Sequence, residues 1–157
     1  VKEKIQIPLI AAGGIATGKG MLAAMVLGAD GVQIGSRFVA SEESSAHINF
    51  KNKVIEAKDG DTLLTLKELA PVRLLKNKFS NDVLELYKSN PSKQDLIDLL
   101  GRARAKLGMF EGDLEDGELE IGQITGLINK IQPASKIVKE IISEFNFEKN
   151  NLKGTMF

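Results

Sequence analysis

The chain lacks cysteine altogether, so it can form no disulfide bond and can offer no thiolate for catalysis. It also lacks an excess of either charge, because 21 Lys and Arg residues are matched by 21 Asp and Glu residues. A chain without net charge gives no global indication of a nucleic acid or an anionic membrane as a partner. No apolar run approaches the roughly 18 residues of a membrane span, and the opening "VKEKIQIP" is too charged for a signal peptide. We therefore expect a cytoplasmic protein with no membrane and no nucleic acid among its partners.

Histidine is nearly absent too. His47 is the only one, and although the pKa of an imidazole suits a general base, no carboxylate or nucleophile is paired with it by a clear spacing. We expect a structural or surface role for it. An initiator methionine is also missing: the chain opens at Val1 and reaches an apolar segment within seven residues. We expect a truncated chain; the alternative is a processed or trimmed one.

What the chain does contain is a pair of similar glycine turns. The first follows the apolar run Ile5–Ala12, which predicts a strand covered on both faces, as in parallel sheets. Gly13 and Gly14 end that run. A helix is predicted from Thr17, a possible cap, to a stop at Gly28.

The second turn comes one unit later. A second short strand is predicted at Val32–Ile34, and it ends at Gly35 and Ser36. The two strand starts are about 25 residues apart, close to the size of one βαβ unit.

Two successive glycine turns of this kind have a specific use. In a (β/α)₈ barrel the loops after the last two strands often build a phosphate site. Glycine lets the backbone approach the phosphate, and bare N–H groups, aided by the positive end of a following helix, hold it. The sequence therefore predicts Gly13 and Gly14 as one half of an anion cradle and Gly35 and Ser36 as the other. The alternative for the glycine pair is a tight turn with no ligand.

The rest of the chain predicts further helices and little chemistry. Thr62–Leu66 is expected as a short strand. The other predicted elements are five helices: one capped by Ser41, one opened by Pro71, one over Ser80–Lys88, one over Lys93–Leu107 that is capped by Ser92, and one that begins at Pro133. The buried side of the last helix is predicted to be Ile137, Val138, Ile141, Ile142 and Phe145.

Three charged features have simple explanations. The segment "EGDLEDGELE" lacks the spacing of a calcium loop, so we expect a solvated loop and no metal site. Lys19 is expected to be solvated. Arg37 follows Ser36 directly, and for it a salt bridge or helix-end contact is as good an explanation as a ligand contact.

At this point the residues carry a resemblance. "AAGGIATGKGMLAAMVLGADGVQIGSRFVASEESSAH" resembles the C-terminal flavin-binding part of the nitronate monooxygenase family, formerly called 2-nitropropane dioxygenases. The later "EGDLEDGELEIGQITGLINKIQPASKIVKEII" is similar to that family's C-terminal region. The similar stretches run from about Ile7 to about Ile142. The related enoyl-acyl-carrier-protein reductase II shares the first of them.

The resemblance implies an α/β fold: the C-terminal part of a (β/α)₈ TIM barrel with a smaller, mostly helical second domain. The implied division is 1–48 for the last barrel portion, 49–117 for the smaller domain, 118–146 for C-terminal helices and 147–157 for a loosely held tail. The first six barrel strands have no counterpart here, as expected of a fragment, and two strands cannot close a barrel.

The resemblance also implies FMN as the cofactor. Gly13, Gly14, Gly35 and Ser36 match family positions that hold the FMN phosphate, and many relatives have Thr where this chain has Ser36. Gln123 matches a position near the flavin end of the cavity; the alternative is a helix-start residue that satisfies backbone groups. No residue matches the family's catalytic histidine, so no catalytic residue is predicted.

For function, the resemblance implies FMN-dependent oxidation of alkyl nitronates with dioxygen by the parent protein, with this chain supplying the phosphate site. One alternative is an FMN- and NAD(P)H-dependent enoyl-acyl-carrier-protein reductase. Another is a non-catalytic flavin- or phosphate-binding fragment. The expected partner is a small-molecule substrate, a nitronate or an enoyl thioester, and a homodimer is left open.

Overall fold

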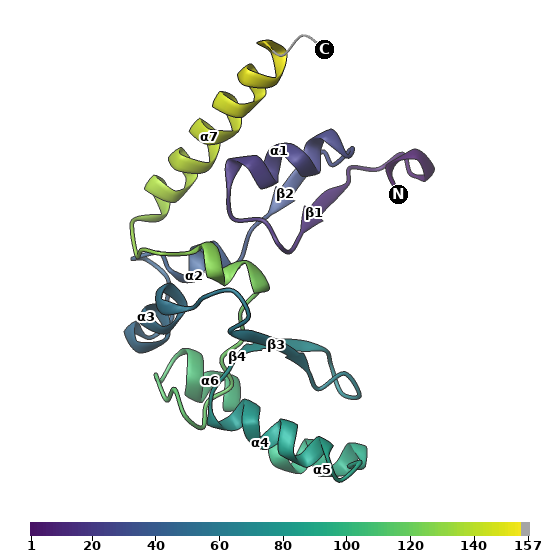
Figure 1. Ribbon diagram of the computed structural model, residues 1–157, viewed down its shortest axis with the longest axis vertical. Helices are drawn as coiled ribbons and strands as arrows, with labels where there is room; N and C mark the ends of the chain where they lie inside the picture. The colour runs from purple at the N-terminus through teal and green to yellow at the C-terminus, as the bar shows by residue number, and fades with distance from the viewer. Residues whose placement is uncertain (155–157) are drawn as a thin grey trace.

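The chain folds into an elongated molecule whose two halves follow one another along its long axis (Figure 1). The computed structural model describes residues 1–154. Its elements are, in chain order, η1 (Lys2–Lys4), β1 (Ile10–Ala12), α1 (Gly18–Val26), β2 (Gly31–Gln33), α2 (Ser36–Val39), α3 (Ile48–Glu56), β3 (Thr62–Thr65), β4 (Val72–Leu75), α4 (Lys78–Tyr87), α5 (Lys93–Leu100), α6 (Arg104–Met109), η2 (Gln123–Leu127) and α7 (Ala134–Gly154). The chain therefore has the α/β character that the sequence predicts.

The first forty residues form the predicted βαβ unit. β1 and β2 pair in parallel, with Ala12 opposite Gln33, and α1 connects them. The Thr17 hydroxyl accepts a hydrogen bond from a main-chain N–H in the first turn of α1 at 3.1 Å, which confirms the predicted cap. The helix ends before Gly28, whose φ of +101° is a conformation that favours glycine.

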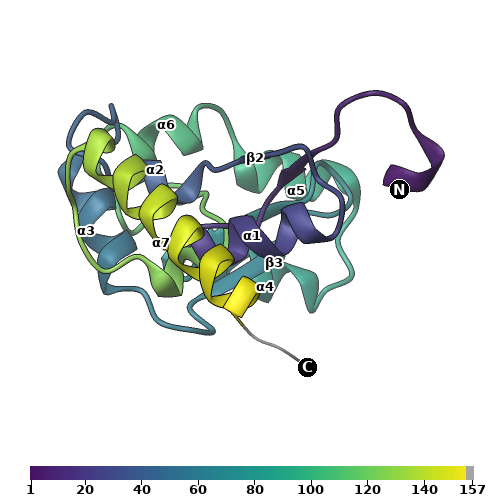
Figure 2. The same cartoon turned by 90° about the horizontal axis from the view of Figure 1, so that it is seen from above.

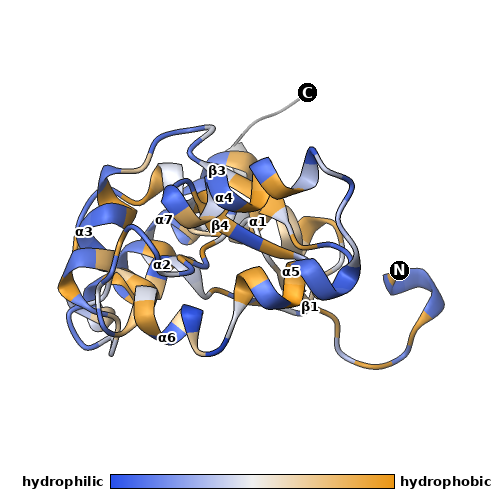
Figure 3. Ribbon diagram, turned by 90° about the horizontal axis from the view of Figure 1, so that it is seen from below, coloured by the Kyte–Doolittle hydropathy of each residue, from blue (hydrophilic) through white to orange (hydrophobic). Residues whose placement is uncertain are grey.

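The opposite half is built on a hairpin. β3 and β4 pair antiparallel, and α4 and α5 each begin with a side-chain cap, at Asn77 and at the predicted Ser92. Hydrophobic and hydrophilic residues alternate along both helices, as expected of amphipathic helices with one apolar face (Figure 3). Their apolar sides close a core with the hairpin, formed by Leu66, Leu74, Phe79, Val83 and Leu96.

A second core lies between the halves. The segment after Gly117 runs along β4, where the Leu75 N–H donates to the Leu119 carbonyl and the Ile121 N–H donates to the Arg73 carbonyl, each at 3.0 Å. Together with α3 and η2 this segment encloses a cluster of Ala40, Phe50, Val54, Leu75, Leu119, Ile121 and Ile128. The division into 1–48, 49–117 and 118–146 stays a prediction.

The long helix α7 packs beside α1 and runs obliquely to it in both views (Figures 1 and 2). It begins after Pro133, as predicted, and Ile137 and Ile141 are buried. Val138 and Ile142 are exposed, so the predicted buried side is wrong at these two positions. The helix continues to Gly154, so the predicted tail is helical over 147–154, while its loose attachment stays a prediction; positions 155–157 lie outside the described residues. No helix of the described part combines the length and apolar character needed to cross a membrane.

Two local predictions near the N-terminal half are wrong. The predicted strand Ile5–Ala12 is a strand only over its last three residues, because the chain before β1 follows the short helix η1 and a bend, and projects away from the molecule (Figure 2). The helix expected after Ser41 begins only at Ile48, with His47 as its cap. Ser41 instead donates its hydroxyl proton to the Phe38 carbonyl at 2.8 Å.

Two more are wrong in the opposite half. Pro71 does not open a helix, since the residues after it form β4 and pair with β3. The single helix expected over Lys93–Leu107 is two helices, α5 and α6. The break occurs where Gly101 has a φ of +64° and Ala103 a φ of +59°, values that no right-handed helix contains.

Candidate functional site

The two predicted glycine turns lie at one edge of the parallel strand pair. Because Ala12 is opposite Gln33 in the ladder, the bends that follow them leave the sheet side by side. Gly13 has a φ of +89° and Gly14 a φ of +69°, and a Cβ placed on either would meet no atom within 4 Å. The positive φ angles favour glycine, and the open space beside the backbone leaves room for a ligand.

The second bend leads straight into α2. Gly35 is the residue before this helix, and it also has open space where a Cβ would stand. Within the described residues, the N–H groups of Gly14, Gly35 and Ser36 donate to no protein acceptor. Bare amides of this kind at a helix start attract anions.

The structure brings Gln123 to the same place. An open hollow of about 490 Å³ is lined by Gly14, Asp59, Gln123, Ile124, Gly126 and Leu127. A second open hollow, of about 670 Å³, is lined by Gly35 and Ser36 together with Gly122 and residues of β4. The Ser36 Oγ joins the two chain segments, because it accepts a hydrogen bond from the Gly122 N–H at 2.9 Å. Four of the five residues predicted for the site thus line these two hollows, and the fifth, Gly13, directly precedes Gly14 in the first bend.

The helix that follows the first bend is not free to hold an anion. The Gly18 N–H at the start of α1 donates to the Glu144 carboxylate at 2.6 Å, and the Thr17 hydroxyl takes a second amide of that turn. The expected help from the positive end of a following helix is therefore wrong for α1, where a protein carboxylate already occupies that end. At the second bend, by contrast, the Ser36 N–H that begins α2 donates to no acceptor among the described residues.

The other charged candidates have structural roles. The Nδ1 of His47 accepts a hydrogen bond from the Asn49 N–H at 3.1 Å and caps α3. Lys19 is exposed and lies 3.3 Å from a carboxylate oxygen of Glu148. Arg37 is buried, and its Nη2 lies 3.5 Å from the Glu140 carboxylate. These places agree with the structural explanations that the sequence left open for them.

The acidic segment is less solvated than predicted. Asp113 accepts hydrogen bonds from the amides of Glu115 and Asp116 and folds the segment into a turn, but Glu118 is buried. Burial raises the pKa of Glu118 to about 7, and the charge of Glu120 adds to the rise while that of Arg104 opposes it. No group of three or more His, Cys, Asp or Glu side chains in residues 1–154 is arranged to hold a metal ion.

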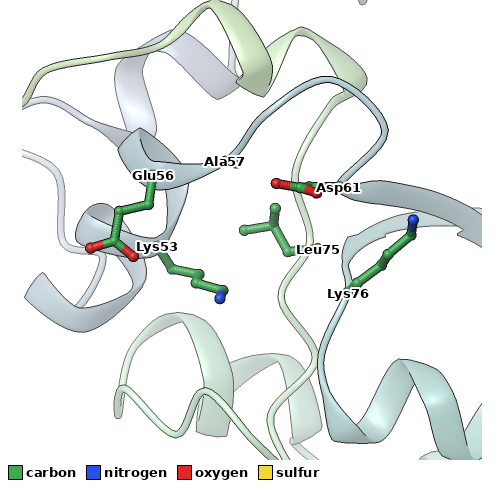
Figure 4. A pocket seen from close by; sticks show the side chains of 6 residues that line it. All are labelled: Lys53, Glu56, Ala57, Asp61, Leu75 and Lys76. Carbon is green, nitrogen blue, oxygen red and sulfur yellow. The ribbon is translucent and has the colours of Figure 1, made fainter.

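A third cavity lies away from the glycine bends. It is lined by Lys53, Glu56, Ala57, Asp61, Leu75 and Lys76, and Figure 4 shows Leu75 between the α3 side chains and those of Asp61 and Lys76. Its volume of about 160 Å³ is below the range of roughly 300–1,000 Å³ that is usual for ligand pockets. A flavin-sized ligand therefore has no room there.

Sequence reasoning missed the contact between Ser36 and Gly122. These residues are 86 positions apart, and the only local indication was the glycine before Gln123 in "IGQITG". A glycine in that segment is compatible with many turns, so its partner could not be named.

Comparison with known proteins agrees with the earlier resemblance. The family model described as nitronate monooxygenase matches residues 1–144. A probable nitronate monooxygenase of Staphylococcus aureus (strain MSSA476) is 33% identical over 151 residues, which are 93% of this chain and 41% of that protein.

Solved structures give the same picture. FabK from Thermotoga maritima superposes with a TM-score of 0.89 at 39% identity, over 99% of this chain and 50% of that one. Nitroalkane oxidase from Streptomyces ansochromogenes gives a TM-score of 0.77 at 29% identity, over 96% of this chain and 43% of that one. The chain therefore spans half or less of the length of these relatives.

Proposed function

Because this chain belongs to the nitronate monooxygenase family, we propose that its two glycine bends hold the phosphate of FMN. The family consists of flavin-dependent oxidoreductases. The observation that supports the proposal is the pair of adjacent bends with open space beside Gly13, Gly14 and Gly35 and with unpaired amides at Gly14, Gly35 and Ser36. A phosphate needs such a set of convergent N–H donors and no side chain in its way.

The two hollows suggest how the remainder of the nucleotide is placed. The phosphate would lie at the bends, and the ring system would extend past Gly14 toward Gln123, whose amide can donate or accept at the ring edge. When bound, FMN supplies the redox chemistry, while the protein binds, orients and shields it. The residues of this chain hold and position the cofactor, and His47 acts as a helix cap.

For the parent protein we propose oxidation of alkyl nitronates with dioxygen to a carbonyl compound and nitrite. β1 and β2 would be neighbouring strands of a (β/α)₈ barrel. Support comes from their parallel pairing and from apolar side chains left uncovered beside them: Ile7 is 68% exposed, Ile10 52% and Val26 72%. In a barrel such side chains pack against neighbouring strands and helices.

An enoyl-acyl-carrier-protein reductase is the second candidate. It is favoured by the identity to FabK, an enoyl-acyl-carrier-protein reductase II, which at 39% is higher than the 29% identity to nitroalkane oxidase. The activities separate cleanly in an assay of the full-length protein. Oxygen uptake with a nitronate and no NADH supports the monooxygenase, whereas NADH consumption with a crotonyl thioester supports the reductase.

The phosphate site is tested by Gly14→Glu in the full-length protein. No protein atom lies within 4 Å of the new Cβ, so the carboxylate would extend into the space proposed for the anion and abolish FMN binding. Gly60→Glu is the matched control, because Gly60 also has a positive φ, +85°, open space at its Cβ and a place outside both hollows. FMN retained by Gly14→Glu, or lost equally from both variants, would show that the anion is not held at this bend.

A further inference from the structure

We infer that Ser36 is a positioning residue, which ties the Gln123 segment to the phosphate bend by accepting the Gly122 N–H. The inference rests on the proposed FMN site and assigns Ser36 a second task there. Its Oγ lies 2.9 Å from the Gly122 nitrogen and joins residues 86 positions apart. We call this contact the Ser36–Gly122 link.

The conformation of Gly122 shows why this position has no side chain. Its φ of −72° and ψ of 156° are extended values that any residue adopts, so backbone freedom is not the reason. A Cβ at Gly122 would stand 2.7 Å from the Ser36 Oγ, while its next neighbours, the Ser36 Cβ and the Ile124 Cγ2, lie at 3.8 and 3.9 Å. A single oxygen atom therefore conflicts with a side chain here, and that oxygen belongs to the link.

The link is the last attachment of this segment before the site. Upstream, the Ile121 N–H is bonded to the Arg73 carbonyl of β4, and downstream η2 begins with the Thr125 N–H donating to the Gly122 carbonyl. Between these two bonds the Gly122 N–H has Ser36 as its acceptor. Without it, the amide next to Gln123 loses its partner and the start of η2 loses its fixed place against α2.

The same hydroxyl can serve the anion at the same moment. A serine oxygen accepts up to two hydrogen bonds and its proton can donate one. Because Gly122 uses an acceptor position, the Ser36 proton is still available for a phosphate oxygen beside the Gly35 and Ser36 amides. Ser36 then connects the phosphate to the segment that presents Gln123, which sets the distance between the two ends of the flavin site.

A double-mutant cycle tests the link. Gly122→Ala removes no donor to the anion, yet its methyl group displaces the Ser36 Oγ, so we expect FMN affinity to fall roughly fivefold to tenfold, the effect of one neutral hydrogen bond. In a Ser36→Ala background the conflicting oxygen is gone, and Gly122→Ala should cost little more than Ser36→Ala alone. Ser36→Thr retains the oxygen and should behave as the wild type in the presence of Gly122.

The first readout is FMN binding, measured as the dissociation constant and as the visible circular dichroism of the bound flavin. The second is hydrogen exchange of the Gly122 amide in the protein without flavin. We expect faster exchange in Ser36→Ala and wild-type exchange in Ser36→Thr. Independent, additive effects of the two substitutions on affinity, or an unchanged exchange rate in Ser36→Ala, would overturn the link. If the wild type binds no FMN, the proposed function fails, and the exchange rates alone then decide whether the link exists.

Discussion

The contact between α1 and α7 yields the sharpest stability prediction. Gly18 lies where the two helices approach, and a Cβ on it would stand 2.3 Å from the Phe145 nitrogen and 2.4 Å from the Ile141 carbonyl oxygen. Both are backbone atoms, which cannot move aside as the end of a flexible side chain can. Gly18→Ala therefore forces α7 away from α1 by about 1 Å, because ordinary carbon contacts need about 3.5 Å.

The magnitude follows from what that movement breaks. Overpacking a well-packed contact costs about 1–3 kcal/mol. The shift also strains the 2.6 Å hydrogen bond from the Gly18 N–H to the Glu144 carboxylate, and bonds to charged groups are worth about 1.5–3 kcal/mol. We expect a loss of about 3 kcal/mol in the free energy of unfolding, or a melting temperature lower by roughly 6–12 °C for a chain of this length.

Gly20→Ala is the matched control. Gly20 lies in the same helix, but its nearest neighbours, the Thr17 Oγ1 and Ile15 atoms, are 3.5 Å or more from a Cβ. The better helix propensity of alanine should leave this variant equal to the wild type or more stable by up to about 1 kcal/mol. Thermal unfolding followed by far-UV circular dichroism compares the three proteins, and equal melting temperatures for the two variants would refute the close approach.

Two further predictions concern buried ionisable side chains. With its pKa raised from 4.5 to about 7 by burial, Glu118 keeps a proton in the folded state that the unfolded chain has already released, so the free energy of unfolding falls as the pH rises from about 4.5 to 7. Glu118→Gln should flatten that dependence in urea unfolding and be the more stable protein at pH 8, by about 1–3 kcal/mol; an unaltered pH profile would contradict the burial of this carboxylate. The Lys51 ammonium group donates to the carbonyl oxygens of Ser41, Glu42 and Ser44. Lys51→Met removes these bonds and should lower the free energy of unfolding by about 2–4 kcal/mol in the same assay. A wild-type value would show that water replaces the ammonium group.

The parts of the fold that could be predicted from the sequence have local causes. Thr17 and Ser92 each cap a helix through the amide three residues away, so the pattern is complete within one turn. The βαβ order of the first forty residues is equally local, since apolar runs and glycine breaks define it. The two glycine bends could be placed for the same reason, while their use as a phosphate site stays a prediction.

The parts that failed depend on distant partners. The segment Val72–Leu75 becomes a strand because β3 offers it an edge, which outweighs the preference of Pro71 for a helix start. The start of α1 is occupied by Glu144, 126 positions away. Neither partner can be inferred from the residues around Pro71 or Gly18, so the sequence alone assigned both segments by their local preference.

The contrast between local causes and distant partners also separates three glycines that the sequence alone cannot tell apart. At Gly14 the space of the missing side chain is empty, at Gly18 it is filled by backbone of another helix, and at Gly122 it is filled by one hydroxyl oxygen. An added carbon atom should therefore impair ligand binding at the first, where the positive φ adds backbone strain, stability at the second, and at the third only while Ser36 keeps its oxygen. Each position fails through a different neighbour, so the three substitutions report on independent features of the molecule. A Gly122→Ala defect that persists after removal of the Ser36 oxygen would mean that the Gly122 backbone itself, and not its partner, determines the glycine.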